Sequence, residues 1–435
     1  MKNIETEVLV IGSGLAGVSA ALAAKKSGKK VMVLSQGAAA SAMSSGALDI
    51  CADPIAVPGC PEKWCPDCGK NIDQLLLRVP EHPYRLIADS SEKIIEEIKN
   101  AVSLVFPGQD GFITGDAKTI QLAFNQIGTF KQTSFMQTHI LSLEDLKMSG
   151  GVLVLSFSGL RDFDPGFFAK NFLHWTSRLG VKVNLNRTEI PGSGLSDTAS
   201  LQMMRWIDEN AQKILESIVK AVKANRAELV IMPALLPFGR RSELINRIEK
   251  DAQVKFRELL AMPPSAPGRR LSQYLNSRLN QEGIELISGQ AAGFNAEAKK
   301  ILSLLAEQNQ DKVEIRGRAF VLATGSFLAG GIEKYDEFKE KLFGLDVFCG
   351  NEPLAKIFTE KLTSASIARP HQVFSVGLRA DEKMRALTRG GEAAYENLFA
   401  AGSILAGGNY IFNGTGAGVA LASGMKSGKT LANLA

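Results

Sequence analysis

The chain has 435 residues, of which 45% are apolar and 22% charged, as is ordinary for a globular protein with a full core. This length predicts two domains, or one large α/β unit with an insertion. The net charge of +5 is small and spread out, and no nucleic-acid-binding motif accompanies it, so we expect no nucleic acid partner. We find no signal peptide and no apolar run near the roughly 18 residues of a membrane span, so we expect a cytoplasmic protein.

The N-terminal stretch predicts a strand, a glycine turn and a helix. Thr6–Ile11 is an apolar run of strand length, a G-x-G-x-x-G turn follows, and Leu15–Ser27 is rich in small residues. The glycines allow a tight turn and the approach of a phosphate, and the helix start offers N–H groups and a positive dipole end. The pattern favours a dinucleotide or flavin site over a plain βαβ crossover. Its expected binding residues are Gly12, Gly14, Leu15, Ala16 and Gly17.

The acidic residue that is expected about twenty residues further on, to hold a ribose, is absent. The second predicted strand, Val31–Leu34, is followed by Ser35, whose hydroxyl lacks the two oxygens of a carboxylate. Either the adenosine end of the ligand is held differently, or the ligand has none. Ser44, Ser45 and Gly46 come just after this strand, and we expect them either at the ligand crevice or in a flexible loop.

Four of the five cysteines fall close together, in an otherwise cysteine-poor chain. Cys60, Cys65 and Cys68 have C-x4-C-x2-C spacing, and Cys51 or Cys349 is available as a fourth thiolate. This spacing suits a zinc knuckle or an iron–sulfur cluster, and we predict a metal site on Cys51, Cys60, Cys65 and Cys68. Buried apolar cysteines and a redox pair are the alternatives.

The middle of the chain predicts a second small α/β domain, because strands and helices alternate there. We expect it at residues 108–261, inserted into a flavin-binding domain formed by residues 1–107 and 262–435. The expected strands are Gly151–Phe157, Val181–Leu185 and Glu228–Met232, and the expected helices are Pro165–Leu179, Ser200–Ala224, Ser242–Glu249 and Ala252–Leu259.

Two further glycine signatures follow in the last part of the chain. A buried strand ends at Thr324 and Gly325, and Gly402-Ser403 precedes a glycine-opened helix at about Gly416–Leu434. A helix N-terminus aimed at a flavin ring stabilises negative charge on it. Together with the first turn, these signatures resemble the Rossmann-like, two-dinucleotide-binding-domain flavoproteins, such as those of fumarate reductase and succinate dehydrogenase, which carry an inserted capping domain. The added binding residues are Thr324, Gly325, Gly402, Ser403, Gly414, Gly416 and Gly418.

A closer resemblance is to the B subunits of anaerobic glycerol-3-phosphate dehydrogenases. It rests on Ser44–Asp49, His82–Tyr84, Ser158–Phe163, Gly325–Phe327 with Gly330-Gly331, Gly344–Val347 and Asp381-Glu382. The cysteine cluster is not part of this family pattern.

This resemblance implies oxidation of sn-glycerol 3-phosphate to dihydroxyacetone phosphate. It also implies an FAD-bearing catalytic A subunit, and an iron–sulfur membrane-anchor C subunit that passes electrons to menaquinone at the inner face of the membrane. The flavin it implies is non-covalent FMN, which agrees with Ser35 because FMN has no adenosine ribose. FAD held by other contacts is the alternative.

Oxidation of a secondary alcohol needs a base for the hydroxyl proton and a cationic cradle for the phosphate. Among four histidines, His371 is the first candidate base and His82 the second, with hydrogen-bonding roles as the alternative. Arg240, Arg241 and Arg270 are candidates for the phosphate, and a solvated positive helix start or a partner surface is the alternative that we favour for them. A fumarate-reductase-like enzyme for another small substrate, and an electron-relay subunit without catalysis, remain alternative functions.

Overall fold

The computed structural model describes residues 2–52, 65–109, 111–308, 311–334, 336–354, 359–366 and 369–431. Its central element is a parallel five-stranded sheet in the order β13-β3-β2-β17-β23. These strands are short apolar runs, as expected of parallel strands buried on both faces. They are β2 (Val8–Ile11), β3 (Val31–Ser35), β13 (Glu285–Ser288), β17 (Ala319–Leu322) and β23 (Leu398–Ala400).

Helices α1 (Leu15–Lys26) and α13 (Gly416–Leu431) pack closely against each other beside this sheet. The contact depends on small residues, because a Cβ added at Gly424 would lie 2.2 Å from the Ala16 carbonyl oxygen. The first and last glycine-opened helices of the chain are therefore neighbours in space.

A second, antiparallel sheet belongs to the same core, in the order β1-β16-β15-β14. The strands are β1 (Lys2–Glu5), β14 (Gln290–Glu297), β15 (Lys300–Gln308) and β16 (Asp311–Arg316).

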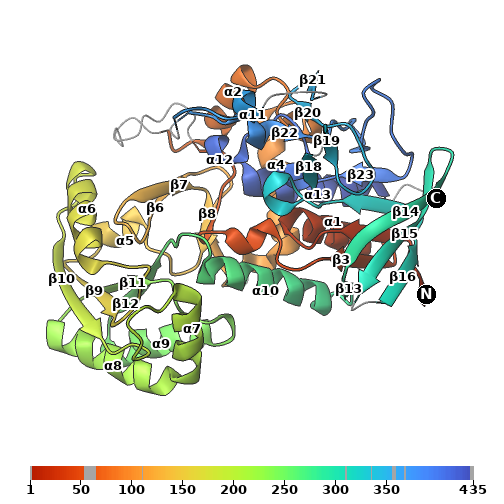
Figure 1. Ribbon diagram of the computed structural model, residues 1–435. Helices are drawn as coiled ribbons and strands as arrows, with labels where there is room; N and C mark the ends of the chain where they lie inside the picture. The colour runs from red at the N-terminus through yellow and green to blue at the C-terminus, as the bar shows by residue number, and fades with distance from the viewer. Residues whose placement is uncertain are drawn as a thin grey trace.

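A third sheet, parallel and in the order β10-β9-β11-β12, has a core cluster of its own that draws buried residues from Phe124 to Leu259. Figure 1 shows it at the lower left with α7, α8 and α9, whereas both chain termini lie at the right. The domain limits at 108 and 261 stay a prediction. The elements are β9 (Gly151–Phe157), α6 (Pro165–Arg178), β10 (Asn184–Ile190), α7 (Ser200–Glu209), α8 (Ala211–Asn225), β11 (Leu229–Pro233), α9 (Arg241–Ala252) and β12 (Lys255–Leu259).

Two helix predictions in this region are wrong. The predicted helix Ala252–Leu259 is the strand β12, because α9 ends at Ala252, Gln253 is left-handed with φ 52°, and the following residues pair with β11. The predicted helix Ser200–Ala224 is two helices, α7 and α8, separated at Asn210, whose φ of −115° is not helical.

Short elements connect the sheets. The sheet β4-β8-β5 and the hairpin of β6 and β7 lie between the five-stranded and the third sheet in the chain path. Within the described ranges, no helix is long and apolar enough to cross a membrane. The remaining elements are η1 (Ala40–Met43), β4 (Ala47–Leu48), α2 (Cys68–Arg78), α3 (Tyr84–Ile87), α4 (Ser91–Val105), η3 (Pro107–Gln109), β5 (Ile113–Gly115), β6 (Gln121–Phe124), β7 (Phe130–Thr133), β8 (Phe135–Gln137), α5 (Leu143–Lys147), η4 (Phe238–Arg240), α10 (Ala266–Gln281), η5 (Phe327–Ala329), β18 (Ile332–Lys334), β19 (Phe338–Glu340), β20 (Phe348–Cys349), β21 (Glu352–Pro353), α11 (Thr359–Leu362), η6 (Gln372–Ser375), β22 (Val376–Gly377), η7 (Gly402–Ile404) and α12 (Tyr410–Asn413).

Candidate functional site

A cavity of about 610 Å³ lies at the carboxyl ends of β2, β3, β17 and β23. Ligands of parallel α/β sheets bind at this edge, and the volume is typical of a cofactor pocket. Residues that precede the first helix, follow each strand and open the last helix all contribute to its wall. The sequence-predicted residues that line it are Gly12, Gly14, Leu15, Ala16, Ser35, Ser44, Ser45, Thr324, Gly325, Ser403 and Gly416.

The other five predicted glycines do not line the cavity and instead permit close packing around it. A Cβ added at Gly17 would lie 1.8 Å from the Gly12 carbonyl oxygen, and one at Gly418 would lie 2.1 Å from the Tyr84 hydroxyl. Added Cβ atoms would meet neighbours within 2.6 to 3.2 Å at the remaining three positions, Gly46, Gly402 and Gly414. These glycines permit the close packing behind the cavity wall, and their role in cofactor binding stays a prediction.

The first turn has the form that its glycines predict. Gly12 has a φ of 114°, and an added Cβ would lie 2.3 Å from the Ala323 carbonyl oxygen, so only glycine fits. Gly14 is the N-cap of α1, and the backbone N–H of Leu15 donates to the Ser41 hydroxyl at 3.1 Å. The positive end of α1 therefore faces the cavity, where it favours a phosphate.

At the end of β3, a pair of hydroxyls stands where an acidic residue was expected. Ser35 Oγ lies 2.7 Å from Ser13 Oγ, and the cavity continues past Ser35 to Gln36 and, across the strand end, to Gln290. On the β17 side, Thr324 Oγ1 is buried in the cavity wall and has no hydrogen-bond partner among the described residues. Because buried polar atoms are nearly always paired, this hydroxyl indicates a missing ligand. These features fit a flavin nucleotide.

The N-terminus of α13 forms the opposite wall, through Gly416, Ala417 and Ala420. The backbone N–H groups of Ala417 and Gly418 donate to the Asp49 carbonyl oxygen at 3.1 and 3.0 Å. The helix start is thus fixed to the segment after β4, and its dipole points into the cavity.

Four acidic or basic side chains line the cavity among the described residues, and none of them was given a role from the sequence. Asp49 Oδ2 lies 2.6 Å from Lys131 Nζ, and the other two residues are Glu340 and Lys341. Glu340 is 1% exposed and accepts from the backbone N–H groups of Leu342 and Phe343 at 2.9 and 2.7 Å. Burial raises the pKa of Glu340 to about 7, against the lowering effect of these two hydrogen bonds.

Neither candidate histidine lines the cavity. His82 is fully buried, with Nε2 3.3 Å from Thr415 Oγ1, while Nδ1 accepts from the backbone N–H of Tyr84. Burial lowers its pKa to about 3, so the ring is neutral and supports the start of α13. His371 Nδ1 accepts from the backbone N–H of Ser364 at 3.2 Å. The base role of both residues stays a prediction.

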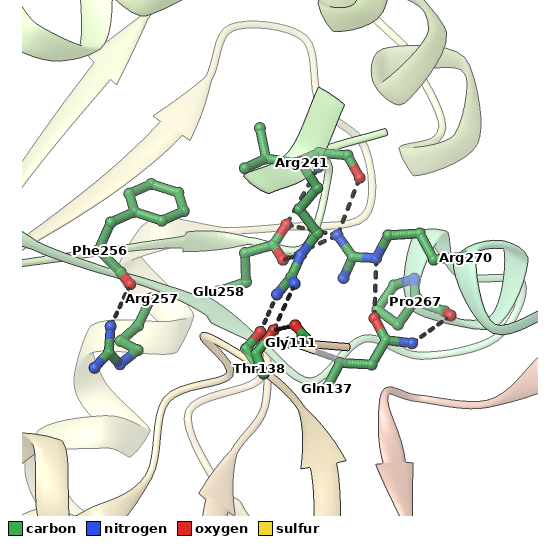
Figure 2. Close-up of polar contacts among 10 residues, drawn as sticks. Gly111, Gln137, Thr138, Arg241, Phe256, Arg257, Glu258, Pro267 and Arg270 are labelled. Carbon is green, nitrogen blue, oxygen red and sulfur yellow. Dashed lines mark hydrogen bonds and ion pairs between the residues drawn. The ribbon is translucent and has the colours of Figure 1, made fainter. Parts of the chain in front are cut away.

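The candidate arginines also lie off the cavity wall. Arg241 and Arg270 bind the carboxylate of Glu258, and we refer to these three residues as the junction cluster (Figure 2). Arg270 Nη1 lies 3.0 and 2.9 Å from the two Glu258 oxygens, and Arg241 Nε lies 2.8 Å from Oε2. Arg240 is exposed and lies near Asp208. The phosphate role of the three arginines stays a prediction.

The junction cluster joins the third sheet to the helix α10, which packs in the first core. Glu258 is on β12, Arg241 begins α9, and Arg270 is on α10. Arg270 Nε also donates to Gln137 Oε1 (Figure 2). Burial raises the pKa of Glu258, but Arg270 and Arg241 outweigh it and hold the pKa below its ordinary value. The carboxylate is therefore charged and fixes the two regions to each other.

The cysteines are only partly covered by the structure, because Cys60 lies outside the described residues. Cys51 and Cys68 are buried, and Cys68 Sγ lies 3.3 Å from Ser134 Oγ. Burial raises the pKa of Cys68 to about 11, whereas a metal ligand must be a thiolate. Within the described residues, no group of three or more His, Cys, Asp or Glu is placed to hold a metal ion. The four-cysteine site stays a prediction.

A parallel sheet with a glycine turn, a buried unpaired threonine and two helix N-termini at one cavity defines a flavin-binding protein. The chain belongs to the FAD binding domain family, whose model matches residues 7–419. This match and the sheet topology confirm the predicted fold class.

The comparison with curated proteins confirms the predicted resemblance. The chain is 25% identical over 433 residues to the B subunit of the anaerobic glycerol-3-phosphate dehydrogenase of Vibrio vulnificus, covering 96% of this chain and 94% of that one. The protein of the same name from Vibrio cholerae is 26% identical over 434 residues, with the same coverage. Among solved structures, 3-ketosteroid delta1-dehydrogenase from Sterolibacterium denitrificans aligns with a TM-score of 0.46 at 11% identity, covering 99% of this chain and 100% of that one.

Proposed function

We propose that this chain is the flavin-carrying B subunit of an anaerobic glycerol-3-phosphate dehydrogenase, an oxidoreductase that takes part in converting sn-glycerol 3-phosphate into dihydroxyacetone phosphate. The observation that carries the proposal is the similarity, along 96% of the chain, to relatives of that name. A cavity whose wall suits a flavin nucleotide supports it independently.

The chain's own groups suggest how the flavin is held. The Gly12–Ala16 turn and the positive end of α1 would hold a phosphate, Thr324 Oγ1 would supply a hydrogen bond, and the start of α13 would stabilise negative charge on the ring system. A flavin bound there supplies a two-electron acceptor for the alcohol carbon.

For the identity of the flavin, we propose FAD, with FMN as the alternative. The family and the extension of the cavity past Ser35 to Gln36 and Gln290 support FAD, whose adenosine end would occupy that extension. The Ser13–Ser35 hydroxyl pair in place of a carboxylate supports FMN. Mass spectrometry of the flavin released from the purified chain distinguishes the two.

The partners and electron acceptor follow from the family resemblance alone. We propose an FAD-bearing catalytic A subunit, and an iron–sulfur C subunit that holds the complex at the inner face of the membrane and passes electrons to menaquinone. Co-purification of the complex from membranes tests this arrangement, and recovery of the chain without any partner would contradict it.

The decisive experiment measures reduction of the bound flavin by sn-glycerol 3-phosphate without oxygen, in the isolated chain and in the complex. Reduction in the complex is the expected result. Turnover by the chain alone would exclude a pure electron relay, and reduction only in the presence of the FAD-bearing partner would support one. Turnover of fumarate instead would replace the proposal with a fumarate-reductase-like activity, and a purified chain without any flavin would overturn every flavin function.

A further inference from the structure

A cation and a carboxylate from different parts of the fold meet at the cavity. Asp49 follows β4, and its carbonyl oxygen accepts from the first N–H groups of α13, so its backbone is fixed. Lys131 is on β7, in the hairpin that leads toward the third sheet. Lys131 Nζ lies 2.6 Å from Asp49 Oδ2, with the side chains 43% and 16% exposed.

The Asp49 carboxylate has a second oxygen with no partner. Asp49 Oδ1 is buried and accepts no hydrogen bond from the described part of the chain, although it belongs to a residue of the cavity wall. A buried carboxylate oxygen without a donor is costly, which indicates that a ligand donates to it. The neighbouring oxygen is paired with a half-exposed lysine, and such a pair is worth little, so a ligand displaces the lysine easily.

The two other charged residues of the described wall are already engaged. Both Glu340 oxygens accept backbone N–H groups, and Lys341 is paired with Glu333. The arginines of the junction cluster bind Glu258 and do not reach the wall. Of the described charged groups at the cavity, Asp49 and Lys131 are therefore the ones placed to bind a substrate.

We propose that Lys131 and Asp49 form the substrate-binding site of this cavity, with Lys131 at the phosphate and Asp49 at a hydroxyl of the glycerol 3-phosphate named by the proposed function. The Lys131 ammonium donates to the phosphate, and Asp49 accepts the hydrogen of a hydroxyl. A ligand with both groups on neighbouring carbons satisfies both side chains, whereas inorganic phosphate or a simple alcohol satisfies one and leaves the other unpaired. This inference rests on the proposed function and deepens it, because it places a substrate site on this chain.

The test compares three ligands with the flavin-loaded chain: glycerol 3-phosphate, propyl phosphate and glycerol. Binding is followed by the perturbation of flavin absorbance and by titration calorimetry. We expect wild type to bind glycerol 3-phosphate most tightly. Lys131→Met should weaken that binding about 10- to 100-fold and leave glycerol unchanged, because a charged hydrogen bond is lost. Lys131→Arg should retain most of the affinity.

The variant Asp49→Asn tests the second contact, between the carboxylate and the substrate hydroxyl. It removes the carboxylate but keeps the side-chain shape, and we expect it to erase the preference for glycerol 3-phosphate over propyl phosphate. Lys147→Met is the matched control, because Lys147 forms an ion pair with Glu144 that lies outside the cavity wall. Thermal unfolding of each variant separates a binding defect from a folding defect.

Equal binding of glycerol 3-phosphate and propyl phosphate by wild type overturns the inference, as does an unchanged affinity in Lys131→Met. These outcomes differ from failure of the proposed function, which would appear as absence of flavin or as turnover of fumarate in place of glycerol 3-phosphate. Calorimetry needs no chromophore and still decides the binding question in that case.

Discussion

The junction cluster and the cavity differ in how their buried oxygen atoms are satisfied, although Arg270 Nη2 in the cluster has no hydrogen-bond partner among the described residues. In the junction cluster, each Glu258 oxygen accepts from two donors, among them Leu236 N–H and the two arginines. At the cavity, Thr324 Oγ1 and Asp49 Oδ1 are buried, and no described residue forms a hydrogen bond with either atom. The difference indicates that the Glu258 carboxylate is satisfied within the chain and stabilises it, whereas the cavity is complete only with a ligand. Substitutions on either side can break this difference or sharpen it.

The largest effect is expected from Glu258→Gln. The change leaves two arginine charges buried without a counter-charge, and such a loss typically costs about 3–5 kcal/mol of stability. Chemical denaturation measures it. The matched control is Asp208→Asn at the exposed contact with Arg240, where we expect less than about 0.5 kcal/mol. Equal effects of the two substitutions would contradict a stabilising role for the cluster.

The same carboxylate predicts a loss of stability in acid. The folded-state pKa of Glu258 is lowered from 4.5 to about 2, so the carboxylate contributes its full stability above the unfolded-state value. That contribution is lost as the pH falls from about 4.5 toward 2, at roughly 1.4 kcal/mol for each pKa unit. The free energy of unfolding, measured as a function of pH across this range, should change more steeply with pH in wild type than in Glu258→Gln. Parallel slopes would assign acid unfolding to other groups, such as the buried neutral His82.

Gly17→Ala is expected to have the next largest effect on stability. Its Cβ would lie 1.8 Å from the Gly12 carbonyl oxygen, so the glycine turn and α1 must move apart. Overpacking of this kind costs about 1–3 kcal/mol, and the displaced turn should also bind flavin more weakly. Gly239→Ala is the control, because an added Cβ there meets nothing within 4 Å. Thermal unfolding with and without flavin measures both effects. A Gly17→Ala variant that resembled this control would show that the turn is not closely packed.

The sequence predicted the fold through its glycines, because a Cβ clash or a positive φ is a local requirement that a sequence displays directly. Gly12 and Gly17 show such requirements, because an added Cβ would lie 2.3 and 1.8 Å from a backbone oxygen. The junction cluster was not predicted, because it joins β12, α9 and α10, and β12 was mistaken for a helix. Its residues are neighbours only after the third sheet has packed on α10, a contact that no local pattern contains.

The charged residues of the cavity were missed for a related reason. Lys131 and Glu340 stand in segments without a recognisable motif, and only the folded chain brings them to the strand ends near Asp49. Conversely, His82 and His371 were chosen by residue type, and neither of them lines the cavity. Candidate binding loops were therefore predictable, whereas candidate substrate contacts were not.

The smallest effect, and the most specific, is expected from Thr324→Val. Valine has the shape of threonine without its hydroxyl, so the variant removes a buried atom that has no partner. The chain without flavin should be unchanged or up to about 1 kcal/mol more stable, since an unsatisfied polar group is gone. Flavin binding should weaken about 5- to 10-fold, because one hydrogen bond to the ligand is lost.

Thr324→Ser keeps the hydroxyl and should bind flavin nearly as wild type does. Fluorescence titration of the flavin-free chain with flavin measures the affinity, and chemical denaturation measures the stability. A variant that lost stability without flavin and bound it normally would place Thr324 with the structural group instead of with the ligand-dependent one.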